Sequence, residues 1–295
     1  MTGTHLLPLP HLYSGKVRDI YAVGDDRLLM VASDRLSAFD VVLDEPIEHK
    51  GRVLTAISAY WFEQTAHLAP NHVISCDPTQ FPAGADAGVA GRAMLVHATR
   101  PVRLECIARG YLFGAAWAEY SERGTVQGRT LPAGMREAEP LPEPLFTPTT
   151  KAEQGHDLPL TDADAAALVG DETFELVRER TLRLYGFGAR RAAERGVILA
   201  DTKLEWGFRG DDLLVIDELL TPDSSRYWPA SEYRPGRSPP SFDKQYVRDH
   251  YLSIGWDKTP PAPHLPPDVI EGTRARYVEV YELVTGRNLA DWFGG

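Results

Sequence analysis

The chain has 295 residues, of which 43% are hydrophobic and 25% are charged, and this composition excludes a disordered or collagen-like protein. At roughly 150 residues per domain, the length predicts one large or two moderate domains. Lysine and arginine number 31 against 42 aspartates and glutamates, so the net charge is −11. Nucleic acid is therefore not an expected partner, because proteins that bind its phosphate backbone usually carry net positive charge.

The sequence also predicts a location in the cytoplasm. No apolar run approaches the roughly 18 to 20 residues that cross a bilayer, so no membrane association is expected. Pro8 and Pro10 interrupt the N-terminal segment where a signal peptide needs a continuous apolar stretch. Cys76 and Cys106 are too few for a disulfide framework, and we expect both to be reduced thiols, with Cys106 in a buried strand.

In chain order, the first half predicts a hairpin, a helix and two more strands. Residues 16–23 and 27–32 are the hairpin strands around a Gly-Asp-Asp turn, and alternation would place Lys16 and Arg18 on one face. Residues 53–64 show helical spacing of apolar side chains. Residues 81–91 are typical of a loop, and strand-like runs follow at 93–99 and 102–108.

The second half begins with a proline-rich segment at 133–148, which predicts a loop or a crossing between two lobes. Thr161 and Asp164 resemble a helix-capping pair. A long helix is expected from about 172 to 194, followed by strands at 197–208 and 213–220. After a second proline-rich loop at 229–240 come predicted helices at 243–251 and 268–285, the last ended by Gly286.

The strand pair at 197–208 and 213–220 is the clearest chemical signal. Asp201, Lys203 and Glu205 share one face of the first strand, opposite an apolar face. A three-residue loop at 210–212 would place Glu205 directly opposite Asp217, and such a carboxylate pair suits Mg²⁺ shared with phosphate and water. The alternatives are solvated acids, neutralisation by Lys203, or a two-residue loop that places the acids on opposite faces.

Other segments suggest anion binding. Gly15 beside Lys16 and Arg18 suits a polyphosphate but does not match a Walker A loop, and a solvated cationic face is the alternative. Residues 221–226 (TPDSSR) would present hydroxyls and a guanidinium at the end of a strand. Arg109, expected just after a strand, is a similar candidate, and a surface ion pair is the alternative for either arginine. The SDRLSAFD segment at 33–40 suggests a ligand loop or helix capping.

Together these segments resemble the SAICAR synthetase (phosphoribosylaminoimidazole-succinocarboxamide synthase) family, almost from end to end. The resemblance rests on seven ordered segments: 15–19 (GKVRD), 33–40 (SDRLSAFD), 109–111 (RGY), 146–153 (FTPTTKAE), 201–205 (DTKLE), 217–226 (DELLTPDSSR) and 241–245 (SFDKQ). It implies an α+β fold with a small β-rich ATP-binding lobe, taken as residues 1–108, and a larger α+β lobe, taken as 109–295. It also implies an ATP-dependent ligase of purine biosynthesis that joins a carboxyaminoimidazole ribonucleotide to L-aspartate and releases ADP and phosphate.

The resemblance further implies a role for each matching residue. Gly15, Lys16 and Arg18 would contact ATP phosphates, and Glu205 and Asp217 would hold Mg²⁺. The substrate-binding set would be Arg109, Ser225 and Arg226 at the ribonucleotide phosphate, with Asp40 and Asp223 at its imidazole or ribose. Lys203 and Lys244 would be carboxylate or transition-state partners, and Asp201 or a phosphate oxygen would accept the proton of the aspartate amine. One departure is Ala115, where many members of the family carry serine.

A carboxylate is a poor acyl donor, so the expected reaction passes through an acyl phosphate, which the aspartate amine then displaces. A small-molecule kinase with the same ATP and Mg²⁺ site is the alternative enzyme, and it would not require aspartate. A nucleotide-binding module without activity is the third hypothesis. The sequence leaves the oligomeric state open between monomer and homodimer.

Overall fold

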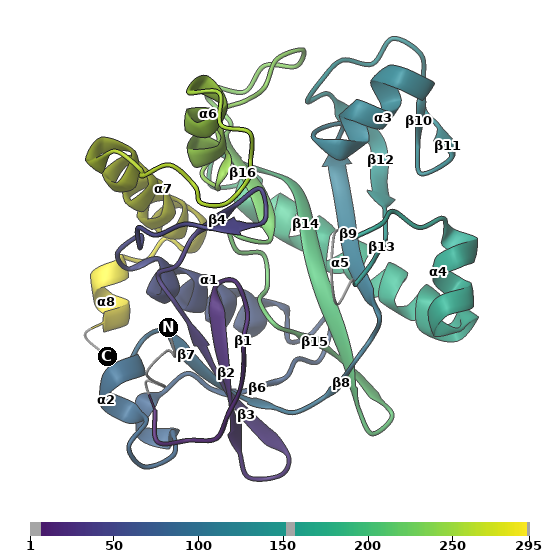
Figure 1. The fold of residues 1–295 in the computed structure, drawn as a ribbon. Helices are drawn as coiled ribbons and strands as arrows, with labels where there is room; N and C mark the ends of the chain where they lie inside the picture. The colour runs from purple at the N-terminus through teal and green to yellow at the C-terminus, as the bar shows by residue number, and fades with distance from the viewer. Residues whose placement is uncertain (1–6, 152–156, 294–295) are drawn as a thin grey trace.

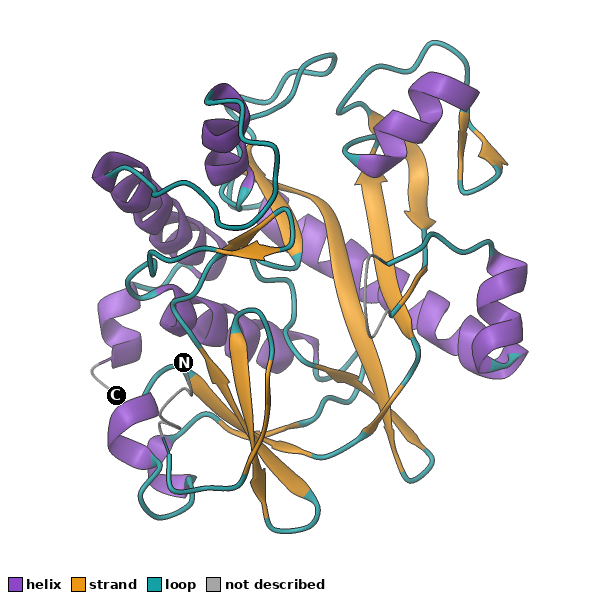
Figure 2. Cartoon of the chain, in the orientation of Figure 1, coloured by secondary structure: helices purple, strands orange, loops and turns teal. Residues whose placement is uncertain are grey.

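The computed structural model describes residues 7–151 and 157–293, which form two large and two small antiparallel sheets with helices packed around them (Figures 1 and 2). The first sheet has five strands in the order β1-β2-β3-β7-β6. Its strands are β1 (His11–Ser14), β2 (Arg18–Val23), β3 (Arg27–Ala32), β6 (Val73–Ser75) and β7 (Ala93–His97). The predicted hairpin is confirmed as β2 and β3, but β2 begins only at Arg18. Lys16 therefore lies outside the strand, and the alternation argument for a face shared with Arg18 was wrong.

The second sheet has seven strands and is organised around one long strand, β14 (Val197–Arg209). Its path is β12-β9-β14-β15, with β13 on β9 and with β8 and β16 on β14. These strands are β8 (Arg100–Pro101), β9 (Leu104–Tyr111), β12 (Pro140–Phe146), β13 (Thr149–Thr150), β15 (Asp212–Ile216) and β16 (Ser225–Pro229). Because β14 has partners on both sides, its polar residues are placed between side chains from neighbouring strands.

Four longer helices complete the core, namely α1 (Lys50–Thr65), α5 (Asp171–Ala193), α6 (Gln245–Ser253) and α7 (Pro267–Thr285). Helix α5 packs on β14 and β9, while α1 packs on α7 and β3. One apolar cluster includes Trp61 of α1 and Trp206 of β14, both fully buried, so both sheets contribute to the same core. Burial of such large side chains is the main stabilising term of the fold.

The remaining elements contribute fewer residues to this core. They are β4 (Ser37–Ala38), β5 (Val41–Val42), β10 (Thr125–Val126), β11 (Arg129–Thr130), the 3₁₀ turn Pro78–Gln80, α2 (Asp86–Val89), α3 (Ala115–Arg123), α4 (Asp162–Val169) and α8 (Leu289–Phe293). Two predicted loops were wrong in part, because residues 81–91 contain α2 and residues 133–148 contain β12. The prolines of β12 are tolerated because it is an edge strand with an irregular register against β9.

Helix boundaries follow the sequence signals closely. The backbone N–H of Asp164 donates to the Thr161 side chain at 3.2 Å, which confirms the predicted cap of α4. Gly286 ends α7 in the left-handed conformation, with φ of 68°, as predicted. Cys106 is fully buried in β9, also as predicted, and both cysteines are free thiols.

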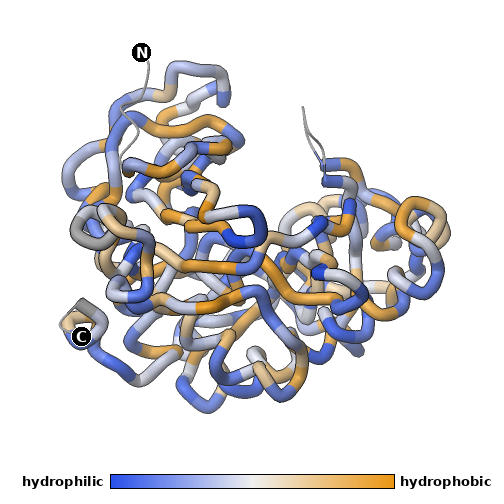
Figure 3. Tube along the Cα trace, turned by 90° about the horizontal axis from the view of Figure 1, so that it is seen from below, coloured by the Kyte–Doolittle hydropathy of each residue, from blue (hydrophilic) through white to orange (hydrophobic). Residues whose placement is uncertain are grey.

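Figure 3 shows hydrophobic segments interrupted by hydrophilic ones throughout the chain. Among the described residues, no helix combines the length and the apolar character that a membrane crossing requires. The last strand of the five-stranded sheet in chain order ends at His97, and the first strand of the seven-stranded sheet begins at Arg100, whereas the predicted lobe division was placed at residue 108. That residue itself lies inside β9, so the division stays a prediction.

Candidate active site

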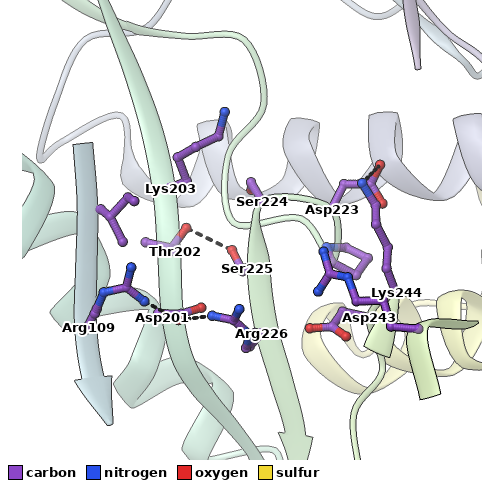
Figure 4. A pocket seen from close by; sticks show the side chains of 13 residues that line it. Arg109, Asp201, Thr202, Lys203, Asp223, Ser224, Ser225, Arg226, Asp243 and Lys244 are labelled. Carbon is purple, nitrogen blue, oxygen red and sulfur yellow. Dashed lines mark hydrogen bonds and ion pairs between the residues drawn. The ribbon is translucent and has the colours of Figure 1, made fainter. Parts of the chain in front are cut away.

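A polar pocket of about 180 Å³ lies where β9, β14 and β16 meet the start of α6 (Figure 4). Seven residues predicted from the sequence line it, namely Arg109, Asp201, Lys203, Asp223, Ser225, Arg226 and Lys244. The remaining lining residues are Ile107, Thr202, Pro222, Ser224, Asp243 and Arg248. The pocket thus collects cationic and hydroxyl side chains from segments far apart in the sequence.

Strand register places Asp201 between two arginines. On one side of β14, Asp201 is opposite Arg109 of β9, and on the other side it is opposite Arg226 of β16. Its carboxylate accepts from Arg109 Nη1 at 3.0 Å and from Arg226 Nη1. Two guanidinium groups on one carboxylate leave one net positive charge, which suits a phosphate or carboxylate ligand. Arg109 was expected after its strand, but it lies within β9.

Hydroxyl groups on β14 and β16 lie next to Asp201 and Arg226 in the same strands. Thr202 and Ser225 are paired across β14 and β16, and their hydroxyl oxygens lie 2.8 Å apart. Close by, helix α3 begins at Ala115, directly after Gly114, whose added Cβ would lie 3.1 Å from Arg226 Nη2. The N-terminus of α3 therefore lies beside the arginine pair, and its unpaired backbone N–H groups favour an anion there.

The opposite end of the pocket is built around Asp223. Its Oδ2 lies 2.7 Å from Lys50 Nζ and 3.2 Å from Lys244 Nζ, and its Oδ1 accepts from the Tyr277 hydroxyl at 2.6 Å. Burial alone would raise the pKa of Asp223, but Lys244 and Lys50 hold that pKa well below its usual range. Asp223 is therefore an ionised carboxylate whose charge is balanced by lysine side chains of the protein itself.

Further along β14, Lys203 lies among acidic side chains. Its ammonium donates to Glu105 at 2.6 Å and to Glu205 at 3.5 Å, and Lys151 also donates to Glu205. Burial alone would lower the pKa of Lys203, but Glu205 and Glu105 raise it above its ordinary value. Lys203 is consequently a permanent cation near neutral pH, and in Figure 4 it extends along β14 away from the arginine pair.

The predicted pairing of Glu205 with Asp217 was wrong. Arg209 pairs with Asp212, so the loop between β14 and β15 has two residues, and Glu205 is opposite Ile216. The strand predicted to continue to residue 220 ends at Ile216, and Asp217 then adopts a left-handed conformation with φ of 67°. Alternation between faces no longer applies after this turn, because the backbone has left the strand.

Asp217 and Glu205 nevertheless share two electrostatic neighbours, Lys203 and Tyr13. Both carboxylates raise the pKa of Lys203, and both raise that of Tyr13, whose pKa is raised chiefly by burial. Asp217 accepts from Arg18, and Arg18 also forms a 2.7 Å ion pair with Glu218. Burial opposes ionisation of Asp217, but Arg18 keeps its pKa below the ordinary value. The two acids therefore lie in one electrostatic neighbourhood through a turn rather than through strand pairing.

The remaining predicted residues lie outside the 180 Å³ pocket. Lys16 forms an ion pair with Asp40, and both side chains are about half exposed. Gly15 belongs to a turn in which its N–H donates to the Arg18 carbonyl at 2.7 Å. Arg35 stabilises that turn by donating to the carbonyls of Gly15 and Lys16. The 33–40 segment thus supports the glycine turn, and part of the 146–153 segment lies outside the described residues.

Sequence reasoning missed several residues of the site. Lys50, Glu105 and Tyr277 come from α1, β9 and α7, and no motif marked them. Arg248 is four residues after Lys244, a spacing that places both on one side of α6 and that could have identified it. Asp243 was part of a quoted segment without a role. It is buried against this wall, and burial raises its pKa.

Close packing explains the glycine that follows Arg109. A Cβ added to Gly110 would overlap the hydroxyl of Tyr185 and lie 2.9 Å from its Cζ. Gly110→Ala should therefore destabilise the fold by about 1 to 3 kcal/mol, the usual cost of overpacking a core. Urea unfolding measures this loss. Gly88→Ala is the control, because its Cβ meets no atom within 4 Å, and an equal loss in both variants would contradict the explanation.

Comparisons with known proteins agree over nearly the whole chain. Residues 11–263 match the family model described as SAICAR synthetase. Curated relatives named phosphoribosylaminoimidazole-succinocarboxamide synthase include one from Halorhodospira halophila, 51% identical over 96% of this chain and 97% of its own, and one from Salinispora tropica, 54% identical over 93% and 98%. A solved SAICAR synthase from Saccharomyces cerevisiae, complexed with SAICAR, covers 97% of this chain and 98% of its own with a TM-score of 0.88 and 38% identity. A SAICAR synthetase in complex with ADP covers 94% and 98% with a TM-score of 0.68 and 25% identity.

Proposed function

The chain belongs to the SAICAR synthetase family, and from this membership we propose how its own residues carry out the family's reaction. It is an ATP-dependent ligase of purine biosynthesis that acts on small molecules, and the kinase alternative is not favoured. The reaction joins the carboxylate of the aminoimidazole ribonucleotide to the amine of L-aspartate. The fold is α+β, as predicted.

One observation supports the residue assignments most strongly: two cation pairs, each sharing a single carboxylate, face one pocket. Arg109 and Arg226 share Asp201, while Lys50 and Lys244 share Asp223. Each group carries one net positive charge, so the pocket suits a substrate with anionic groups at both ends. The aminoimidazole ribonucleotide has this form, with a phosphate at one end and a carboxylate at the other.

We assign its phosphate to the arginine end, with Ser225 beside Arg109 and Arg226. Ala115 supplies no hydroxyl there, and we assign the hydrogen bonds to the phosphate to the first backbone N–H groups of α3 instead. Asp223 and Lys244 form the other end of the substrate site. Asp40 completes the proposed set from the turn between β4 and β5, where it forms an ion pair with Lys16.

We assign the ATP phosphates to the turn and strand start that carry Gly15, Lys16 and Arg18. A similar solved structure is described as a complex with ADP, which supports a nucleotide site in this fold. Arg18 is mostly buried, and its guanidinium is fixed by Asp217 and Glu218. One guanidinium and two carboxylates sum to one negative charge, so Arg18 would face phosphate favourably only with the charge of Mg²⁺ at Asp217 beside it.

Glu205 and Asp217 fit a Mg²⁺ ion by the chemistry of their oxygen donors. Mg²⁺ is usually bound by one or two carboxylates together with water and substrate phosphates, and the described residues contain no cluster of three or more potential ligands. Both carboxylates interact electrostatically with Lys203, and Glu205 also lies 3.5 Å from its ammonium. A bound Mg²⁺ would neutralise phosphate charge during phosphoryl transfer.

The chemical step follows from these positions. An oxygen of the substrate carboxylate attacks the γ-phosphorus of ATP, and the bond to ADP breaks to give an acyl phosphate. The aspartate amine then attacks the carbonyl carbon, the bond to phosphate breaks, and an oxygen of the departing phosphate accepts the proton of the amine. Lys203 and Lys244 balance the negative charge of the carboxylate and the departing phosphate. No nucleophile of the protein is required.

Turnover itself provides the test of the function. ADP release should require both the carboxylated ribonucleotide and L-aspartate, and mass spectrometry should detect the succinocarboxamide. ADP release that does not depend on aspartate and that yields a phosphorylated product would instead support the kinase. The cytoplasmic location and the choice between monomer and homodimer stay predictions.

Asp201 was one of two expected proton acceptors, beside a phosphate oxygen, and its two arginine contacts favour a positioning role instead. Asp201→Asn should weaken ribonucleotide binding about tenfold, because the two guanidiniums lose a charged hydrogen-bond partner. The pH dependence of kcat should stay unchanged. Calorimetry and a pH profile measure both quantities, and a collapse of kcat at unchanged affinity would restore the role of proton acceptor.

A further inference from the structure

Lys50 is a lysine with no exposed surface, and no motif marked it. It is the first residue of α1, yet its ammonium lies 2.7 Å from Asp223, 173 residues further along the chain. Lysine is almost never fully buried without a charged partner. Its position is therefore tied to Asp223 and not to the helix that carries it.

Asp223 has more cationic partners than its charge requires. Oδ2 receives both Lys50 and Lys244, while Oδ1 is occupied by the Tyr277 hydroxyl. Two ammonium groups and one carboxylate sum to one positive charge. Lys50 does not line the pocket, whereas Lys244 does, so the surplus charge reaches the pocket through Lys244 (Figure 4).

The two lysines lie at different distances from the Asp223 carboxylate. Lys50 is 0.5 Å closer to Oδ2 than Lys244, by 2.7 Å against 3.2 Å. The Lys50 ammonium also lies 5.6 Å from the ring centroid of Tyr277, which gives a second favourable contact in the buried interior. Lys50 is thus the lysine that donates a hydrogen bond to Asp223 from the buried side, and Lys244 forms a longer ion pair with the same oxygen on the pocket side.

We propose that Lys50 is a positioning residue that neutralises Asp223 from inside, so that Lys244 presents its charge to an anionic group of the ribonucleotide substrate. Without Lys50, Lys244 and Asp223 would form a neutral pair and the pocket would lose one positive charge. Because this assignment rests on the proposed function, its test uses equilibrium binding, which does not depend on turnover.

The experiment is a double-mutant cycle. Lys50→Met removes the charge at similar volume and should weaken binding of the carboxylated aminoimidazole ribonucleotide, measured by calorimetry, about tenfold. The KM for ATP should not change. In a Lys244→Met background, Lys50→Met should cause little further loss, because residues that act through one another are not additive.

Tyr277→Phe is the matched variant, because it removes a hydrogen bond to Asp223 without changing charge. It should weaken ribonucleotide binding less than Lys50→Met. Thermal unfolding verifies that each variant is folded. If Lys50→Met does not fold, Lys50→Gln, which keeps a neutral donor, replaces it in both backgrounds with the same expectations.

Unchanged binding in the Lys50 variant, or equal losses with and without Lys244, would overturn the proposal, since either result means that Lys50 does not act through Lys244. Product formation by the unmodified chain is measured separately. If that product is absent, the proposed function fails, whereas additive losses in an active enzyme overturn only the role of Lys50.

Discussion

Replacement of Glu205 by alanine is expected to lower kcat about 100-fold or more while the protein stays folded, in the range that loss of a metal-held phosphoryl charge produces. Glu205 is one of two carboxylates assigned to Mg²⁺, and its side chain also fixes Lys203 and Lys151. Lys203 keeps its 2.6 Å partner Glu105 in the variant, so no buried cation is left without an anion. The expected defect is therefore catalytic.

Steady-state kinetics across a Mg²⁺ titration, together with thermal unfolding, measure this effect. The variant should need more Mg²⁺ for half-maximal activity. Glu122→Ala is the control, because that side chain is exposed and pairs only loosely with its neighbour Arg123 at 3.7 Å. Near-normal turnover in the Glu205 variant would remove the metal assignment.

Replacement of Arg109 by methionine is expected to weaken ribonucleotide binding about 10- to 100-fold, because a hydrogen bond to a charged group contributes about 1.5 to 3 kcal/mol. Asp201 would still have Arg226, but the two would form a neutral pair, and the surplus charge at the phosphate end would be lost. The KM for ATP should change little, since Arg109 is separate from the turn that carries Gly15 and Lys16.

Calorimetry with the ribonucleotide measures this loss, and inorganic phosphate serves as a competing probe. Phosphate should compete less well in the Arg109 variant than in the unmodified protein. Arg123→Met is the matched control, because Arg123 is exposed at the far end of α3. Equal phosphate competition in all three proteins would show that the arginine pair does not bind the phosphate.

The site shows which of its features can be predicted from local sequence pattern and which cannot. Alternation along β14 predicted a charged face made of Asp201, Lys203 and Glu205, and in the structure each of these side chains has a charged partner. The hairpin register was wrong, because a change of one residue in loop length reverses every facing pair and the sequence does not determine that length. Asp217 follows β15 in a left-handed turn that no periodicity predicts, and its place beside Glu205 at a shared Mg²⁺ stays a prediction.

Buried charge was equally hidden from the sequence. Lys50 stands at the start of a helix whose apolar spacing was correctly predicted, and a lysine at a helix end is ordinarily solvated. Its burial depends on Asp223 and on Tyr277 of α7, both distant in the chain. The same is true of Glu105, whose role becomes visible only when β9 is paired with β14.

The α+β class, most helices and strands, the family and the polar segments that carry the chemistry were predictable from the sequence. These features depend on local spacing and on short motifs along the chain. Which charged side chains pair with one another depends on the tertiary structure. Asp201 lies between two arginines because β14 has partners on both sides, and Asp223 lies between two lysines because α1, α6 and α7 converge on one turn. Electrostatic interactions depend on distance in space, and the folded chain alone sets that distance.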